Sequence, residues 1–315
     1  MDMQDVVVVG GGAAGLAAAL TLVRARRSVL VVDAGEPRNA PADAVHGYLG
    51  RDGVPPGELL DIGRREVEGY GGRVLLGRVT AASRSDDGFV VDIEGAAPVR
   101  ARRLLLATGL VDELPAVPGL RERWGRDVLH CPYCHGWEVR DRTIGVLATG
   151  PMTMHMALLM GQWSSDLTLF RHTGFALTDE EREQLGARRV RVVDGEVTAL
   201  AVADDRLRGL RLRSGEVVAC EALVVTPRYL ARDVPGLGVE LAEHPAGIGQ
   251  RVGADPATLQ VAPGVWAAGN VDNLMAQVGN AAADGVRAAI AINSDLVAED
   301  VRRAVDASRS VSAAR

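Results

Sequence analysis

Two cysteines separated by two residues lie in the stretch His130-Cys131-Pro132-Tyr133-Cys134-His135-Gly136-Trp137-Glu138. Thiols at this spacing can close into a small disulfide ring. Proline directly after Cys131 suits the first turn of a helix, where its missing N–H costs nothing. Cys131 is therefore predicted at a helix N-terminus, whose partial positive charge stabilises a thiolate. Because His135 can exchange a proton with that thiolate, the stretch predicts a dithiol/disulfide centre with its own acid–base partner.

Three other interpretations of the same residues stay open at this point. Cys-x-x-Cys-His is also the attachment pattern for a c-type haem, which normally needs export, and no secretory signal precedes the first strand. A zinc site would need two further ligands, and only Cys220 remains among the cysteines, so no metal site is predicted. Two inert, buried cysteines would leave the surrounding Pro, Tyr, His and Gly unexplained. The context favours the redox pair.

The composition excludes several classes of function. The chain has 315 residues, enough for two domains, with 47% apolar and 24% charged residues. Its formal net charge is −6 and it has no polybasic run, so no binding to nucleic acid or to an anionic membrane is predicted. The chain contains no lysine, which excludes Schiff-base and P-loop lysine chemistry. No apolar run reads as a membrane span, and three cysteines fit a cytoplasmic protein.

The N-terminal segment predicts a dinucleotide site. A β-branched strand at 5–9 runs into Gly10-Gly11-Gly12-Ala13-Ala14-Gly15, a helix follows to about Arg26, and a strand at 28–32 ends at Asp33. In this order Gly10 permits the tight turn, Gly12 lets the backbone approach a pyrophosphate, and Gly15 lets helix and strand pack closely. Asp33 can accept hydrogen bonds from a ribose.

A second strand–turn–helix unit follows the cysteines, with a strand at 143–148, a turn, a helix at 152–163 and a strand at 166–171. In the register of the first unit, the three glycine positions read Ala148, Gly150 and Thr153, and no ribose-binding acid follows. We predict a domain that keeps the nucleotide-binding fold and has lost the nucleotide. The fold class is thus α/β, with two Rossmann-like, three-layer domains. His155 on the second helix is predicted to be packed.

The remaining segments predict the following features. The irregular segment 34–56, with Arg38, Asn39 and His46, is a functional loop, and the prolines at 114–119 mark a domain crossing. A helix is predicted at 276–292, followed after Asn293 by a separate polar helix and a fraying tail, and Cys220 is predicted to be inert. Further elements are predicted at 57–70 (helix) and at 73–79, 88–94, 102–108, 188–193, 197–202, 207–213 and 222–226 (strands).

The order of these motifs resembles the low-molecular-weight thioredoxin reductase family over nearly the whole chain. That resemblance implies a split FAD domain, residues 1–114 and 236–315, and an inserted domain, residues 115–235, which carries the Cys-x-x-Cys and a degenerate nicotinamide-nucleotide fold. It also implies a homodimer. The cofactor-binding residues that we predict are Gly10, Gly12, Ala13, Ala14, Gly15, Asp33, Ala34, Arg38, Asn39, His46, Ala107, Thr108, Gly109, Gly269, Asn270, Ala276, Gln277 and Val278.

This chain also departs from the family pattern. Family members with reductase activity have an aspartate where His135 stands, and their arginines for the 2′-phosphate are replaced by His172, Thr173 and Leu177. Asn270 stands where the family has an aspartate. Cys-Pro-Tyr-Cys-His-Gly-Trp-Glu, together with residues 33–39 and 46–49, is similar to one branch, the FAD-dependent dithiol oxidases that close disulfides in natural products such as gliotoxin and holomycin.

That branch implies an FAD-dependent oxidation of a small-molecule dithiol to its disulfide, with dioxygen reduced to hydrogen peroxide. Substrate would attack Cys131, Cys134 would lie nearer the flavin, and His135 would deprotonate the incoming thiol. Two alternatives stay open: a disulfide reductase that uses NADPH or a carrier protein, and a flavin-containing redox sensor. The lost nucleotide-binding residues favour the oxidase over the reductase.

Overall fold

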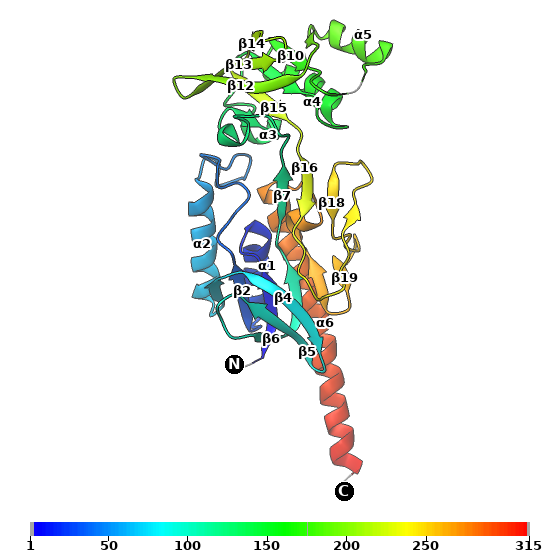
Figure 1. Ribbon diagram of the computed structural model, residues 1–315. Coiled ribbons are helices and arrows are strands. Elements are labelled where there is room, and N and C mark those ends of the chain that lie inside the picture. The colour runs from blue at the N-terminus through cyan, green and yellow to red at the C-terminus, as the bar shows by residue number, and fades with distance from the viewer. Residues whose placement is uncertain (1–2, 175, 314–315) are drawn as a thin grey trace.

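The structure is a computed structural model that describes residues 3–174 and 176–313. Two α/β units lie one above the other, joined by a pair of adjacent strands, and a long C-terminal helix extends from the lower unit (Figure 1). The helices are α1 (Ala13–Arg24), α2 (Pro56–Gly69), α3 (Pro132–His135), α4 (Thr153–Leu159), α5 (Asp179–Ala187) and α6 (Val278–Ala313), with 3-10 turns η1 (Arg121–Arg123), η2 (Met160–Gln162) and η3 (Gly269–Val271).

The lower unit is built on an eight-stranded sheet with the central order β19-β20-β6-β1-β2-β3 and an attached β4–β5 hairpin. Strand β1, in the middle of this sheet, contains a run of valines because both faces of the sheet are buried there. Val6 and Val8 face α1, α2 and α6, whereas Val7 and Val9 face the β4–β5 side. The strands are β1 (Gln4–Val9), β2 (Val29–Asp33), β3 (Arg73–Leu76), β4 (Val79–Ser85), β5 (Gly88–Ile93), β6 (Val99–Leu106), β19 (Gln260–Ala262) and β20 (Val265–Ala267).

The upper unit repeats this three-layer arrangement around a parallel sheet of order β11-β10-β9-β15-β8. Helices α4 and α5 cover one face, and the antiparallel sheet β12-β13-β14 covers the other. The strands are β8 (Val128–Leu129), β9 (Ile144–Leu147), β10 (Leu167–Phe170), β11 (Arg191–Val193), β12 (Val197–Ala203), β13 (Arg206–Leu212), β14 (Val217–Ala219) and β15 (Ala222–Val225). The predicted fold class, two Rossmann-like domains, is therefore confirmed.

Two neighbouring strands connect the units. β7 (Leu110–Glu113) carries the chain upward and β16 (Arg228–Ala231) carries it back, and the two pair antiparallel from Leu110↔Ala231 to Glu113↔Arg228. Their sheet is completed by β17 (Ala242–Glu243) and β18 (Gly249–Arg251). We propose domain boundaries after residues 114 and 235, shortly beyond these two strands.

The C-terminal segment differs from its prediction. Instead of breaking after Asn293, α6 continues as one helix of 36 residues, and every side chain from Val301 to Ser312 is exposed. Alanine and arginine, both strong helix formers, recur through the segment that we predicted to fray, and it contains neither glycine nor proline. Ion pairs also hold the middle of α6 to the body: Arg102 binds the carboxylate of Asp300 and Arg103 that of Asp295, each at 2.5 Å. Near its start, Gly285 allows α6 to approach α1 closely, because a Cβ there would lie 2.1 Å from the Ala14 carbonyl oxygen.

No helix in residues 3–174 and 176–313 is long and apolar enough to cross a membrane.

Candidate active site

A cavity of about 700 Å³ lies between the two units. Its size is in the range of small-molecule and cofactor sites. Residues from the lower unit, from both connecting strands and from the upper unit line it together. Of the predicted site residues, those that line it are Gly10, Gly12, Ala13, Ala14, Asp33, Ala34, Arg38, Asn39, His46, Ala107, Thr108, Gly109, Cys131, Cys134, His135, Asn270, Ala276, Gln277 and Val278.

Cys131 and Cys134 form a disulfide at the wall of this cavity, with their Cα atoms 5.3 Å apart. As predicted, Cys131 is the residue that precedes the first turn of a helix, α3, and Pro132 opens that helix. Because α3 has only four residues, the charge that its N-terminus presents to a thiolate is smaller than that of a full-length helix. Backbone bonds from the N–H groups of Cys134 and His135 to the Cys131 carbonyl close the turn.

His135 is half-buried at the end of α3, beside the disulfide and facing the cavity. Burial lowers the pKa of His135, with His46 adding to the effect and the Glu138 carboxylate opposing it. The imidazole is therefore neutral around neutral pH, which is the form that can accept a proton from a thiol.

His46 links the predicted functional loop to the redox segment. Its Nε2 lies 3.5 Å from Glu138 Oε1, and its Nδ1 lies 3.6 Å from Asp52 Oδ2. Glu138 is the last residue of the quoted cysteine stretch, so one imidazole spans the lower and upper units. Our sequence analysis assigned no role to Glu138.

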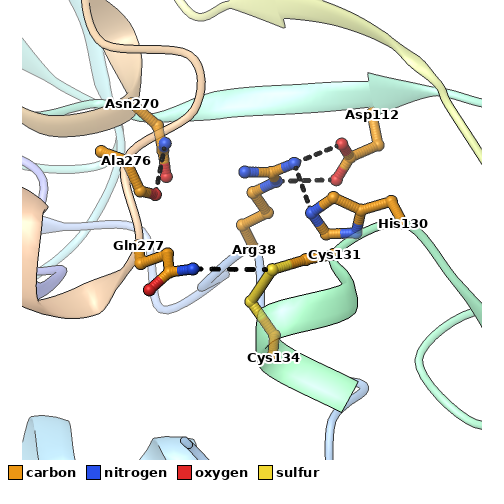
Figure 2. The surroundings of a disulfide bond; sticks show 8 residues. All are labelled: Arg38, Asp112, His130, Cys131, Cys134, Asn270, Ala276 and Gln277. Atoms are coloured by element: carbon orange, nitrogen blue, oxygen red, sulfur yellow. Dashed lines mark hydrogen bonds and ion pairs between the residues drawn. A yellow bond between two sulfur atoms is a disulfide. The ribbon is translucent and has the colours of Figure 1, made fainter. Parts of the chain in front are cut away.

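Arg38 makes the second such link. Its guanidinium forms two parallel bonds with the Asp112 carboxylate, at 2.7 and 2.8 Å, and its Nη2 lies 3.2 Å from His130 Nε2 (Figure 2). The ring of His130 stacks on Trp124, with the ring centres 5.3 Å apart. Sequence reasoning quoted His130 but gave it no role, and it missed Asp112 and Trp124 altogether.

Asn270 in η3 and Gln277 shortly after it shape the cavity wall opposite the redox pair. The side-chain nitrogen of Gln277 lies 3.9 Å from the sulfur of Cys131 (Figure 2). The amide nitrogen of Asn270 donates to the carbonyl of Ala276 at 2.9 Å and to that of Asn273 at 3.1 Å. An aspartate could not make these donations, so the asparagine that departs from the family pattern fixes the turn that presents Gln277.

The glycine-rich turn has the geometry of a phosphate cradle. A Cβ on Gly10 would lie 2.2 Å from the Ala107 carbonyl oxygen, and one on Gly15 would lie 1.9 Å from that of Gly10, whereas nothing lies within 4 Å of one on Gly12. Gly12 precedes α1, whose first turn has no side-chain cap and no acidic residue. Uncapped N–H groups at the start of a helix favour an anion. Asp33 lies beside the turn and is held by Arg64 at 3.0 Å.

The contrast among these glycines yields a prediction. A Gly12→Ala substitution is expected to leave the protein folded, since the new methyl group meets no atom of the chain, but to reduce retained flavin at least tenfold by filling the cradle. The flavin-to-protein absorbance ratio and the thermal unfolding temperature measure the two effects. Gly57→Ala, which also meets nothing within 4 Å, is the matched control. Full flavin content in the Gly12 variant would contradict the assignment.

The second unit lacks the corresponding cradle. At the third glycine position, the fully buried Thr153 turns its hydroxyl back to the Gly150 carbonyl at 2.7 Å. Beyond the next strand, Arg171 pairs with Asp194 at 2.6 Å, and His172 Nδ1 accepts from the Val197 N–H at 3.0 Å. Burial lowers the pKa of His172, so the ring is neutral and offers no charge to a 2′-phosphate.

The helix after that turn faces the shared cavity instead. Met152, Met156 and Leu159 line it together with the exposed His155, so the prediction that His155 is packed is wrong. Cys220, in contrast, is 1% exposed, and burial raises the pKa of its thiol to about 12, as expected of an inert cysteine.

Fold, disulfide and cradle together define a flavin-dependent disulfide oxidoreductase. The model of the pyridine nucleotide-disulphide oxidoreductase family matches residues 4–285, and the chain belongs to that family. It is 31% identical over 309 residues to the thioredoxin reductase tcpT of Claviceps purpurea, covering 95% of this chain and 96% of the relative. It is also 31% identical to the thioredoxin reductase sirT of Leptosphaeria maculans, covering 94% and 95%. The crystal structure of HlmI superposes with a TM-score of 0.91 at 48% identity, covering 98% of each chain. The resemblance predicted from the sequence is confirmed.

Proposed function

We propose that this protein is an FAD-dependent oxidase that converts a small-molecule dithiol to its intramolecular disulfide, with dioxygen as the electron acceptor. The observation that carries the proposal is the pairing of an intact redox disulfide with a second nucleotide-binding fold that lacks the glycine cradle. The disulfide shares a cavity with the glycine cradle, while the side chains of Thr153, Arg171 and His172 are bonded to other groups of the protein. The loss of the glycine cradle and of the 2′-phosphate arginines favours a dithiol over a hydride donor as the source of electrons.

The residues of the cavity fit FAD. The open space at Gly12 and the uncapped start of α1 suit a pyrophosphate, and Asp33 suits a ribose. Ala107, Thr108, Gly109, Asn270 and Gln277 line the part of the cavity that leads from this cradle to the disulfide. When bound, FAD would take two electrons from the reduced cysteine pair and pass them to dioxygen, giving hydrogen peroxide.

The chemistry of the chain itself is thiol–disulfide exchange. His135 takes the proton from a substrate thiol, and the resulting thiolate attacks Cys131, forming a mixed disulfide and releasing Cys134 as a thiolate. The second substrate thiol then attacks the substrate sulfur of the mixed disulfide. Cys131 leaves, the substrate disulfide closes, and the cysteine pair has gained the two electrons that the substrate has lost. We assign the flavin-facing role to Cys134 because the family resemblance implies it.

The mouth of the cavity supports a compact, largely apolar substrate. Met152, Met156 and Leu159 lie where the upper unit would otherwise bind a nucleotide, and Tyr133 adds an aromatic edge that is 65% exposed. Methionine side chains adapt to irregular apolar shapes. The homodimer remains a prediction, for which α6 offers a face, since Val297 and Val301 on successive turns are 46% and 57% exposed.

Anaerobic reduction of the bound flavin tests the proposal. Excess dithiothreitol is expected to bleach the flavin absorbance, excess NADPH is expected to leave it unchanged, and admitting air after the dithiol is expected to yield one hydrogen peroxide per flavin. A Cys131→Ser variant, in which the exchange path is broken, is the control and should resist the dithiol. Rapid bleaching by NADPH would instead identify a reductase.

A further inference from the structure

Arg38 connects the two strands that join the units with the segment directly before the redox pair. It comes from the loop after β2, whereas Asp112 lies in β7, Tyr229 in β16 and His130 directly before Cys131. The guanidinium binds Asp112 through two nitrogens, reaches His130 Nε2 at 3.2 Å and lies 5.2 Å from the centre of the Tyr229 ring. Only arginine has a planar fork that can hold a carboxylate and still donate elsewhere.

We propose that Arg38 is a positioning residue for the dithiol centre: by holding Asp112 and His130 together, it fixes the Cys131 backbone at the cavity and leaves His135 as the base. The inference rests on the proposed function for its substrate, but the arrangement of the four side chains stands without it.

The contacts of His130 show how Arg38 leaves His135, and not His130, as the base. A guanidinium is always charged and can only donate, so His130 Nε2 must accept from it and carries no proton. Burial and the Arg38 charge lower the pKa of His130 to about 3, and the Asp112 carboxylate opposes them only in part. The groups facing the ring are Arg38, Asp112, Tyr229, Trp124 and His135. Two histidines flank the cysteine pair, and Arg38 removes one of them from proton transfer.

The same contacts fix the cysteine in space. His130 is held on one side by Trp124, at 5.3 Å between ring centres, and on the other by Arg38. Cys131 follows it directly and meets Gln277 across the cavity at 3.9 Å. Loss of Arg38 therefore frees both the residue before the sulfur and the β7 carboxylate. Misplacing reacting atoms by about 1 Å can cost on the order of a hundredfold in rate.

Two substitutions separate the positioning role of Arg38 from the effect of its charge. In Arg38→Met the Asp112 carboxylate is left facing His130, so the His130 pKa is expected to rise toward its ordinary value, and dithiol oxidation to fall about a hundredfold. In Arg38→Lys the charge stays and the fork is lost, so His130 should stay neutral while the rate still falls about tenfold. Should Arg38→Met fold poorly, Arg38→Met/Asp112→Asn removes both charges and leaves no unpaired carboxylate.

The experiment follows the histidine ring signals of the holoprotein by NMR against pH, next to the pH profile of dithiothreitol oxidation. Arg51→Ala, an exposed arginine of the same loop, is the control and should match the wild type. A wild-type His130 titration and a wild-type rate in Arg38→Met would overturn the inference. If the wild-type protein itself does not oxidise the dithiol, the proposed function fails, whereas the NMR titration still decides whether Arg38 holds His130 neutral.

Discussion

Replacing either Cys131 or Cys134 by serine is expected to reduce dithiol oxidation about a thousandfold or more, to the uncatalysed background. Both sulfurs are needed because the exchange opens one disulfide and closes another, and a lone thiol has no bond to give up. Peroxide formation from dithiothreitol measures the loss. Cys220→Ser is the matched control and should retain full activity, since that thiol is buried and its raised pKa keeps it protonated.

The same two variants test the roles assigned to the sulfurs. Treated with an aromatic disulfide reagent, the Cys134→Ser protein, which keeps Cys131, is expected to form a mixed disulfide faster than the Cys131→Ser protein. This test is needed because Gln277, which belongs to the cavity wall that we assign to the flavin, lies 3.9 Å from the sulfur of Cys131. If Cys134 reacts faster, the two cysteines exchange roles and the rest of the mechanism stands.

His135→Ala is expected to slow dithiol oxidation about a hundredfold, because the substrate thiol loses its base. The sign of the pH dependence follows from the burial of the ring. His135 works as neutral imidazole, so the rate falls as the pH falls through its pKa. That pKa is lowered, which places the acid limb of the wild-type profile below the ordinary 6.5.

Two comparisons make the histidine prediction specific. The alanine variant should lose the acid limb as well as the rate, while His244→Ala, a histidine outside the cavity, should show neither change. A variant with unchanged turnover would remove His135 from the mechanism. A lower rate with the wild-type pH profile would mean that the ring positions substrate without taking the proton.

Much of the fold could be predicted because local patterns determine it. A run of four valines, glycines at fixed spacing and a following acid specify strand, turn, helix and strand whatever the rest of the chain does. The elements that the sequence analysis did not predict depend on tertiary contacts. β4, which carries only small and polar side chains over part of its length, forms a strand because β5 lies beside it. The end of α6 stays helical because ion pairs hold the middle of the helix to the body of the protein, and alanines and other helix-forming residues continue the helix beyond them.

The site was predictable only where chemistry and sequence position coincide. The cysteine pair and His135 are consecutive in one motif, and their placement together needs no long-range contact. Asp112 and Arg38, by contrast, are 74 residues apart. An aspartate in a connecting strand carries no sequence pattern that distinguishes it from a solvated one. The sequence identified the loop that supplies Arg38, but not the partners that the fold brings to it.

The two connecting strands have a consequence for how such a protein can arise. The chain leaves the flavin unit on β7 and re-enters it on β16, and these strands lie side by side, with Glu113 opposite Arg228. Adjacent antiparallel strands are only about 5 Å apart, so a short turn could join them if everything between were absent. The upper unit is thus a cassette with neighbouring ends. The residues that this unit contributes to the cavity can therefore change while the eight-stranded sheet of the lower unit keeps its strand order.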